Sequence, residues 1–335
     1  MATDFEGEHM KRYLVTIVIL VCLGGCVSLP GTSTTPPPKM IDVSLPVGYI
    51  PNVQFAPLYV AIEKGYFAAE GINLKLDYSF ETDAVSLLGA NELQFAIASG
   101  EQVLLARTRD LPVVYVAAWY QKYPVAVASK SGKGLLKPED LRGKVIGVPV
   151  LSGASYIGLR TILDAGGLSE KDVTLGVIGF SQIEMLATDR VDAAVVYVAN
   201  EPVVLESQGY LTDLIRVDDY LTLVSNGLVT NEKTLAEDPE LVKGMIRALL
   251  HGMSDVIADP DEAYRISTKY VETLAQADTT VQKQVLIRSI ELWQGASLGL
   301  SDPAAWNNML LILVKMGMVP ADLDVSRAFT NDFLP

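Results

Sequence analysis

Residues 41–78 read IDVSLPVGYIPNVQFAPLYVAIEKGYFAAEGINLKLDY, and this stretch decides the class of fold. Apolar residues at every second position predict a first strand that ends near Tyr49. Pro57 can occupy the first turn of a helix, and Gly65 can end that helix. Alternation resumes over residues 72–76 and predicts a second strand. The segment is therefore a predicted strand–helix–strand unit, which is typical of a parallel sheet covered by helices.

The same alternation continues along the chain. Ser99 and Gln102 have the spacing of a capping box at the start of one helix. After residue 230 the chain is mostly helical, because apolar residues recur on one helix face. Two sets of strands and helices with a helical tail predict an α/β protein of two lobes, with a ligand cleft beyond the carboxyl ends of the strands. The further predicted strands cover residues 93–98, 112–119, 124–129, 144–150, 173–178, 191–198 and 221–230, and the helices cover 82–88, 99–107, 152–165 and 182–187.

The start of the chain is a predicted secretory signal. The basic pair Lys11-Arg12 precedes an apolar run that ends in Leu23-Gly24-Gly25-Cys26. The run is too short to span a bilayer, which needs about 20 apolar residues. Its end resembles a bacterial lipobox, in which the cysteine thiol receives a lipid. We therefore expect residues 1–25 to be removed and Cys26 to be lipidated.

A tether is predicted to follow the lipidated cysteine. Residues 26–40 contain Ser, Thr and the run Pro36-Pro37-Pro38, a composition typical of a semi-rigid, extended linker. Translation can begin at Met1 or at Met10, and the sequence leaves both open. An acyl chain would hold the protein at the cell membrane without spanning it, facing outside the cytoplasm.

The composition excludes several classes of function. With 335 residues, 50% of them apolar, the chain is long enough for two domains with real cores. Its 40 acidic and 26 basic residues give a net charge of −14, which disfavours nucleic-acid binding. Two His and two Cys are too few for clustered metal ligands or a disulfide scaffold. His9 falls in the signal and His251 in the helical tail, so we predict no catalytic residues, no metal and no cofactor.

The turns after the predicted strands carry aromatic and neutral-polar side chains. Aromatic rings stack on flat ligands, and amides and hydroxyls orient them, so the predicted ligand is flat and uncharged or weakly charged. Glu101 and Glu201 can accept hydrogen bonds from ring N–H groups. Ser152 begins a helix whose free amides can hold a polar oxygen, although an ordinary N-cap explains it equally well. The candidate ligand-binding residues in these turns are Tyr49, Asn52, Gln54, Phe55, Glu101, Trp119, Tyr120, Ser152, Tyr156, Tyr197, Asn200 and Glu201.

Several blocks of the sequence resemble one family of transport proteins, the substrate-binding proteins of ABC importers. The branch is the one that binds thiamine pyrimidine precursors, sulfonates and riboflavin, and the resemblance covers about residues 41–315. The blocks are Gly48-Tyr49-Ile50-Pro51-Asn52, Ala56-Pro57-Leu58-Tyr59-Val60-Ala61, Glu63-Lys64-Gly65-Tyr66-Phe67, Ser99-Gly100-Glu101-Gln102-Val103, Asp192-Ala193-Ala194, Asn200-Glu201-Pro202 and Asn226-Gly227-Leu228-Val229-Thr230-Asn231.

This resemblance implies a type II periplasmic-binding-protein fold, whose two lobes close on a ligand about two crossing strands. It implies lobe 1 from residues 41–130 plus 226–335 and lobe 2 from residues 131–225, with crossings near 128–133 and 224–230. It adds Asn226 on the return strand to the candidate ligand-binding residues. It also implies a monomer that binds a small molecule, docks on an ABC-type permease in the membrane and has no enzymatic activity.

Within the family, the sequence is most similar to the riboflavin-binding lipoproteins. The run from Tyr49 to Pro57 and the pair Trp119-Tyr120 carry this similarity. The pyrimidine synthases of the superfamily have a cysteine-rich motif and active-site His residues, and this sequence has neither. The pyrimidine branch usually places a His just after Pro-Asn, where Val53-Gln54-Phe55 stands here. We therefore expect riboflavin as the transported ligand.

Three alternatives remain open at the level of sequence. A pyrimidine precursor of thiamine is the nearest, because it belongs to the same branch. A sulfonate or nitrate would need a cationic side chain, and Arg160 is the candidate, two turns into its predicted helix. An enzyme acting at the cell surface could use Glu101 and Glu201 as an acid–base pair. Turnover of a ligand would distinguish that enzyme from a binding protein.

Overall fold

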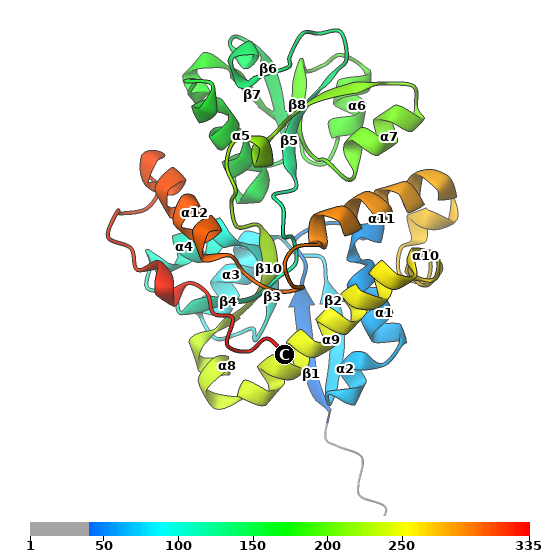
Figure 1. Ribbon diagram of the computed structural model, residues 1–335, viewed down its shortest axis with the longest axis vertical. Coiled ribbons are helices and arrows are strands. Elements are labelled where there is room, and N and C mark those ends of the chain that lie inside the picture. The colour runs from blue at the N-terminus through cyan, green and yellow to red at the C-terminus, as the bar shows by residue number, and fades with distance from the viewer. Residues whose placement is uncertain (1–39) are drawn as a thin grey trace, which may run out of the picture. The chain divides into compact units, whose positions relative to one another are not determined.

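The opening segment forms the predicted strand–helix–strand unit. The structure is a computed structural model that describes residues 40–335. In it, β1 (Ile41–Pro46) pairs in parallel with β2 (Ile72–Asp77), and α1 (Ala56–Glu63) and α2 (Tyr66–Ala69) lie between them in the chain. Gly65 separates the two helices with φ at +74°, a left-handed conformation that glycine adopts without strain. Figure 1 shows β1 and the two helices in blue.

A three-stranded sheet stands beside this unit in the fold. Its order is β3 (Ala96–Ser99), β10 (Asn226–Asn231) and β4 (Val113–Ala118), with β10 antiparallel to both neighbours. Helix α3 (Glu81–Gly89) leads from β2 into β3, and α4 (Gly100–Arg107) connects β3 to β4. The predicted strand over 221–230 begins only at Asn226. The pairing here is antiparallel rather than parallel, because the central strand returns from a distant part of the chain and runs in the opposite direction.

The third sheet has five strands in the order β7-β6-β8-β5-β9. Strand β6 is parallel to β7 and β8, whereas β5 is antiparallel to β8 and β9, so this sheet is mixed. The edge strand β9 was not predicted, since its residues show no clean alternation. The bounds are β5 (Val125–Lys130), β6 (Val145–Val148), β7 (Thr174–Val177), β8 (Ala193–Tyr197) and β9 (Thr212–Arg216), with helices α5 (Gly153–Ala165), α6 (Gln182–Ala187) and α7 (Glu201–Ser207).

Two short segments connect the three-stranded sheet to the five-stranded sheet. Residues 119–124 lead from β4 into β5, and residues 217–225 lead from β9 back to β10. The first crossing therefore precedes the predicted position near 128–133, because residues 125–130 are already paired with β8 and β9. Division into lobes at residues 130 and 226 stays a prediction, and the strand pairing favours the earlier segment 119–124 as its first boundary.

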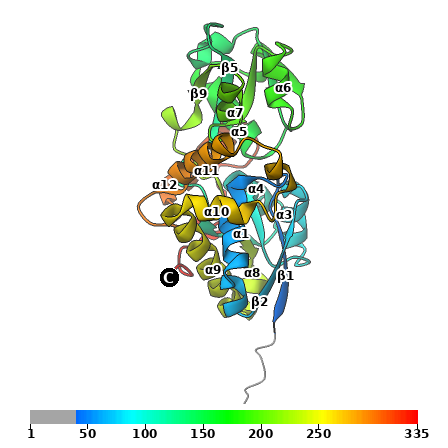
Figure 2. The same cartoon turned by 90° about the vertical axis from the view of Figure 1, so that its right-hand side faces the viewer.

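The C-terminal third is helical, as predicted. Helix α9 packs along α1, and Figures 1 and 2 both show the two side by side. A Cβ atom on Gly252 of α9 would lie 2.1 Å from the carbonyl oxygen of Pro57, so only glycine allows this approach. The helices are α8 (Glu232–Glu237), α9 (Pro239–Ala258), α10 (Pro260–Ser267), α11 (Thr279–Trp293) and α12 (Pro303–Lys315), and short 3-10 turns cover 53–55, 138–141, 170–172, 217–219, 272–275 and 325–327.

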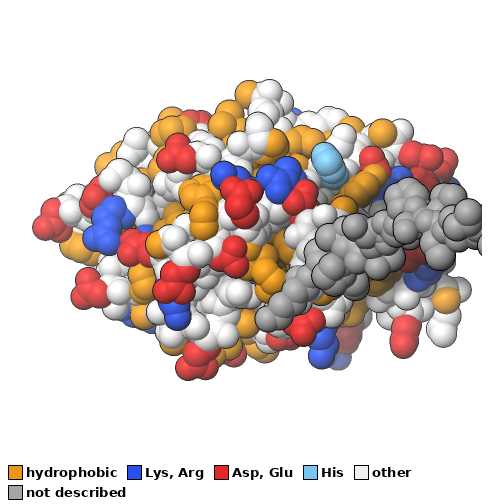
Figure 3. Space-filling model, turned by 90° about the horizontal axis from the view of Figure 1, so that it is seen from below, with side chains coloured by type: hydrophobic (Ala, Val, Ile, Leu, Met, Phe, Trp, Pro, Cys, Tyr) orange, Lys and Arg blue, Asp and Glu red, His pale blue; other side chains and the backbone are white. Residues whose placement is uncertain are grey.

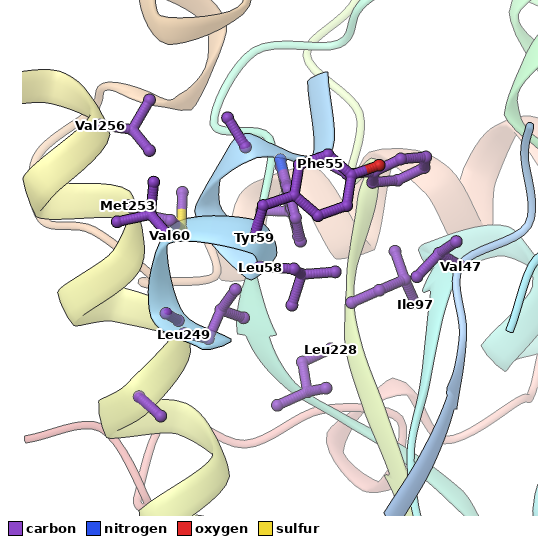
Figure 4. Packing of buried hydrophobic residues seen from close by; sticks show 14 of the residues in the cluster. Val47, Phe55, Leu58, Tyr59, Val60, Ile97, Leu228, Leu249, Met253 and Val256 are labelled. Atoms are coloured by element: carbon purple, nitrogen blue, oxygen red, sulfur yellow. The ribbon is translucent and has the colours of Figure 1, made fainter. Parts of the chain in front are cut away.

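One hydrophobic cluster joins the C-terminal helices to the first sheets. Figure 4 shows Leu58 of α1 directed toward Ile97 and Leu228 of the three-stranded sheet, while Val60 lies toward Met253 of α9. All of these side chains are at most 4% exposed. Burial of such aliphatic groups contributes about 1.5–3 kcal/mol each, which stabilises the packing of α1 against α9 and this sheet.

The surface charges are interspersed. Figure 3 shows acidic and basic side chains scattered among apolar ones on the face it presents. Ion pairs such as Arg247–Glu70 at 2.6 Å and Lys64–Asp255 at 2.8 Å account for part of this mixture. Among residues 40–335, none of the helices has the length and apolar character that a membrane span requires. The predicted signal, the lipidated Cys26 and residues 26–39 of the tether lie outside the described residues.

Candidate ligand-binding cavity

A cavity of about 350 Å³ lies between loops of the two lobes. From the first lobe come the turn after β1, the start of α3, Ile97, the segment after β4 and the start of β10. From the second come the β6–α5 turn, the β7–α6 turn and the segment between β8 and α7. These are ends of strands, which is where ligands of α/β sheets bind.

Ten of the thirteen predicted ligand-binding residues line this cavity. Segments more than 170 residues apart in the chain, such as those of Tyr49 and Asn226, thus meet at one place. Their roles toward a ligand stay a prediction. The ten are Tyr49, Gln54, Phe55, Trp119, Tyr120, Ser152, Tyr197, Asn200, Glu201 and Asn226.

The other three predicted residues do not line the cavity. Asn52 caps the turn over 53–55, where its side-chain oxygen accepts from the N–H of Gln54 at 2.9 Å. Glu101 is fully buried beside the cavity and contacts the hydroxyl of Ser99. The hydroxyl of Tyr156 donates to Glu170 and accepts from Arg160. Tyr156 follows the cavity-lining Ser155 directly, and successive helix residues face different directions.

Two kinds of aromatic residue border the cavity. Trp119 is 2% exposed and meets the rings of Phe55 and Trp293 edge to face, so it belongs largely to the core wall. Tyr49 pairs with Phe180, which is 41% exposed, at 4.7 Å between ring centroids. Phe80, which also lines the cavity, is 57% exposed, so Phe80 and Phe180 are more accessible to a ligand than Trp119.

Hydrogen bonds link four polar side chains that line the cavity. The hydroxyl of Tyr120 donates to Gln54 Oε1 at 3.1 Å, and that of Tyr197 donates to Asn226 Oδ1 at 2.9 Å. The rings of Tyr120 and Tyr197 meet edge to face at 6.1 Å. The bond between Tyr197 and Asn226 joins the two lobes, and both bonds hold neutral amide groups beside the cavity.

Both carboxylate oxygens of Glu201 accept hydrogen bonds from residues of its own loop. Its Oε2 accepts the N–H of Tyr197 at 2.9 Å, and its Oε1 accepts from the amide of Asn200 at 3.0 Å. Burial raises the pKa of this carboxyl, and these donors oppose the shift. Glu201 therefore shapes the start of α7, and both of its oxygens already have partners.

Ser152 occupies the N-cap position of α5, but its side chain makes no cap bond. Gly153 follows with φ at +70°, which turns the chain into the helix. The first amides of a helix have no intrahelical partner. This turn therefore presents N–H donors to the cavity, which suits a carbonyl or hydroxyl oxygen.

Sequence reasoning missed several lining residues that also follow strands. Phe80, Glu81 and Thr82 follow β2, and Phe180 and Gln182 follow β7. The strand-end rule that selected the other turns would have found them. Phe80 and Phe180 are aromatic, so the residue types in these two turns also fitted the pattern that selected the other turns.

The charge of the cavity is negative or neutral. None of its lining residues is Lys, Arg or His, and Glu81 and Glu201 are the acidic ones. Arg160, the candidate for a sulfonate, forms an ion pair with Glu170 at 2.8 Å and does not line the cavity. His251 lies in α9 against Tyr66, also outside it. Within residues 40–335, no group of three His, Cys, Asp or Glu side chains could hold a metal ion.

Comparison with known proteins gives the chain its relatives. The family described as NMT1/THI5 like matches residues 52–263. Riboflavin-binding protein RibY from Chloroflexus aurantiacus is 39% identical over 346 aligned positions, which cover 97% of this chain and 99% of that protein. A formylaminopyrimidine-binding protein from Halalkalibacterium halodurans is 31% identical, covering 67% of this chain and 69% of its own length.

A solved structure supports the architecture independently. The alkanesulfonate-binding protein SsuA from Xanthomonas axonopodis pv. citri, bound to MOPS, superimposes with a TM-score of 0.68. It covers 87% of this chain and 98% of its own, at 14% identity. At that identity the likeness concerns the fold alone, and it confirms the predicted two-lobed periplasmic-binding architecture.

Proposed function

This chain belongs to the NMT1/THI5-like family, and on that premise we propose that it captures riboflavin outside the cytoplasm and delivers it to an ABC-type permease. It is a substrate-binding protein of the importer type. Riboflavin is the finer step, supported by a relative of that name that aligns over nearly the whole chain.

The observation that carries the proposal is the lining of the cavity. Its volume of about 350 Å³ falls within the range of about 300–1,000 Å³ for small-molecule sites. Aromatic rings, amides and hydroxyls from both lobes surround it, without a basic side chain. A flavin has a flat ring system, an imide edge and a hydroxylated tail, and these groups match that lining.

A fluorescence titration tests the ligand. Riboflavin fluorescence should be quenched on binding, with a saturable curve and a stoichiometry of one. Formylaminopyrimidine is the second candidate, favoured by the relative that binds it. Binding of the pyrimidine without binding of riboflavin would make the pyrimidine the preferred ligand. Mass analysis after incubation should recover the ligand unchanged if the protein is a binding protein.

We further propose a lipid-anchored, monomeric protein at the outer face of the cell membrane. The sequence Leu23-Gly24-Gly25-Cys26 and the proline-containing tether support the anchor. Delivery then requires a permease in the same membrane, because the anchor holds the binding lobes within reach of it. Co-purification of the permease with the lipidated protein would support this partnership.

A further inference from the structure

Ser99 connects two carboxyl groups beside the cavity. Its hydroxyl contacts Oε1 of both Glu81 and Glu101, and its backbone N–H donates to Glu81 Oε1 at 2.8 Å. A serine hydroxyl has one proton to donate, and an ionised carboxylate only accepts. One of the two contacts therefore needs a proton on a carboxyl group, so the trio holds one carboxyl proton.

The surroundings place this proton on Glu101. Its side chain is 0% exposed, and its Oε2 has no hydrogen-bond partner among the described residues. Burial, with the charge of Glu81 as the second cause, raises the pKa of Glu101 to about 8. Burial also raises the pKa of Glu81, but both donors of Ser99 converge on its Oε1 and favour its charged form.

Glu81 presents its second oxygen to the cavity. It is the first residue of α3 and lines the cavity, whereas Glu101 does not. Both Ser99 donors are received by Oε1, and Oε2 extends toward the opposite lobe. A Cβ atom placed on Gly153, the first residue of α5, would lie 3.9 Å from that oxygen. Glu81 therefore reaches the space between the lobes.

We propose that Glu81 is the charged acceptor of this site, which receives an N–H or O–H donor of an uncharged ligand through Oε2, while Glu101 and Ser99 keep it ionised. Glu201, the other acid of the lining, has both oxygens engaged within its loop. The inference rests on the proposed function, because a flavin supplies such donors at its imide edge and its hydroxylated tail. Glu101 is in this view a positioning residue.

Three variants, each lacking one carboxylate or carboxyl group, test the assignment by riboflavin quenching at pH 7. Glu81→Gln retains an acceptor for Ser99 but turns an N–H donor toward the ligand, and we expect at least about tenfold weaker binding. Asp83→Asn changes an exposed acid in the same helical turn and should bind like the unmodified protein. Glu101→Gln donates to Ser99 as the protonated acid does, so it should lose less affinity than Glu81→Gln.

The outcomes separate this inference from the proposed function. If the unmodified protein binds riboflavin and Glu81→Gln binds equally well, Glu81 is not the acceptor. An equal loss in Glu81→Gln and Glu101→Gln would overturn the placement of the proton. Absence of any quenching by the unmodified protein contradicts riboflavin as ligand instead. Infrared spectra without ligand at pH 7 then test the carboxyl proton by itself. The unmodified protein should show the band of a protonated carboxyl group, and Glu101→Gln should lose it. Absence of this band from the unmodified protein would refute the shared proton.

Discussion

The rings of Tyr49 and Phe180 meet edge to face, with centroids 4.7 Å apart and an interplanar angle of 87°. Tyr49 follows β1 in the first lobe, and Phe180 follows β7 in the second, so this contact joins the lobes across the cavity. Edge-to-face pairs contribute about 0.5–1.5 kcal/mol beyond the burial of area. The pair therefore links the two lobes beside the cavity, and we expect it to cover a bound ring.

Phe180→Ala should weaken riboflavin binding about fivefold to thirtyfold, from the lost contact and the lost apolar burial. The melting temperature of the free protein should change little, since this side chain is 41% exposed. Val177→Ala is the matched control, because Val177 is 62% exposed in the same lobe and does not line the cavity. Unchanged affinity in Phe180→Ala would show that the pair does not cover the ligand.

Riboflavin should bind at least about tenfold more tightly than its phosphorylated form, which corresponds to about 1.4 kcal/mol. No lining residue is basic, Glu81 and Glu201 are acidic, and the chain carries a net charge of −14. These negative charges would repel a phosphate group at the end of the riboflavin tail. Paired quenching titrations at equal ionic strength measure the ratio, and tighter binding of the phosphate would point to a cation outside the cavity lining.

Stability should depend on pH through Glu101. Its folded pKa of about 8 lies above the ordinary value of 4.5, so the folded state binds more protons between these limits and its stability falls as pH rises from about 4.5 to 8. Glu101→Gln has no ionisable group at this position, so it should not lose stability over this pH range. The unfolding free energy of the variant relative to the unmodified protein should therefore increase between pH 5 and pH 8, by at least about 1.4 kcal/mol, the equivalent of one pKa unit.

Glu101 titrates as a pair with Glu81, because the two carboxyl groups face each other. The ionisable groups that face it are Glu81, Tyr115, Tyr123 and Tyr197, and burial raises the pKa of all three tyrosines, which stay neutral over this range. Thermal unfolding of both proteins at several pH values measures the difference. A difference that is constant from pH 5 to 8 would mean that Glu101 is ionised in the folded protein.

Gly252→Ala should destabilise the fold by about 1–3 kcal/mol, although alanine favours helices more than glycine does. The added methyl group would lie 2.1 Å from the carbonyl oxygen of Pro57 and force α9 away from α1. Gly176→Ala is the control, because the nearest atom to its Cβ would be 3.9 Å away. Chemical denaturation of both variants tests this, and equal stability would mean that α9 shifts freely.

Cys26→Ser should prevent lipidation and release the protein from membranes, because a serine hydroxyl offers no thiol to the lipid donor. The motif Leu23-Gly24-Gly25-Cys26 motivates the test. Mass spectrometry of the N-terminal peptide and fractionation of cells measure the outcome. A variant that still carries the lipid would refute the lipobox.

Strand ends were predictable from sequence because alternation fixes the strands, and ligands gather where parallel strands end. Tyr49, Tyr120 and Asn200 were found in this way. The direction of a side chain within a turn was not predictable. Tyr156 lies one residue beyond the lining and pairs with Glu170 instead.

Long-range partners account for the remaining differences. The spacing of Ser99 and Gln102 suggested a capping box, but the hydroxyl of Ser99 contacts Glu81 and Glu101 and makes no cap bond. Glu81 is 18 residues away in the chain, and no local pattern signals that encounter. Antiparallel pairing of β10 likewise depends on a segment that returns from the other lobe.

The position of β10 sets an order of folding. It lies between β3 and β4, yet more than 100 residues separate it from β4 in the chain. During synthesis, β3 and β4 emerge with no strand between them, whereas β5 to β9 are contiguous and can pair at once. Such non-local contacts slow folding, because the loop must close before they form. The second lobe should therefore become protease-resistant first, and the sheet that carries Ile97 and Asn226 should be completed only after residue 231 has emerged.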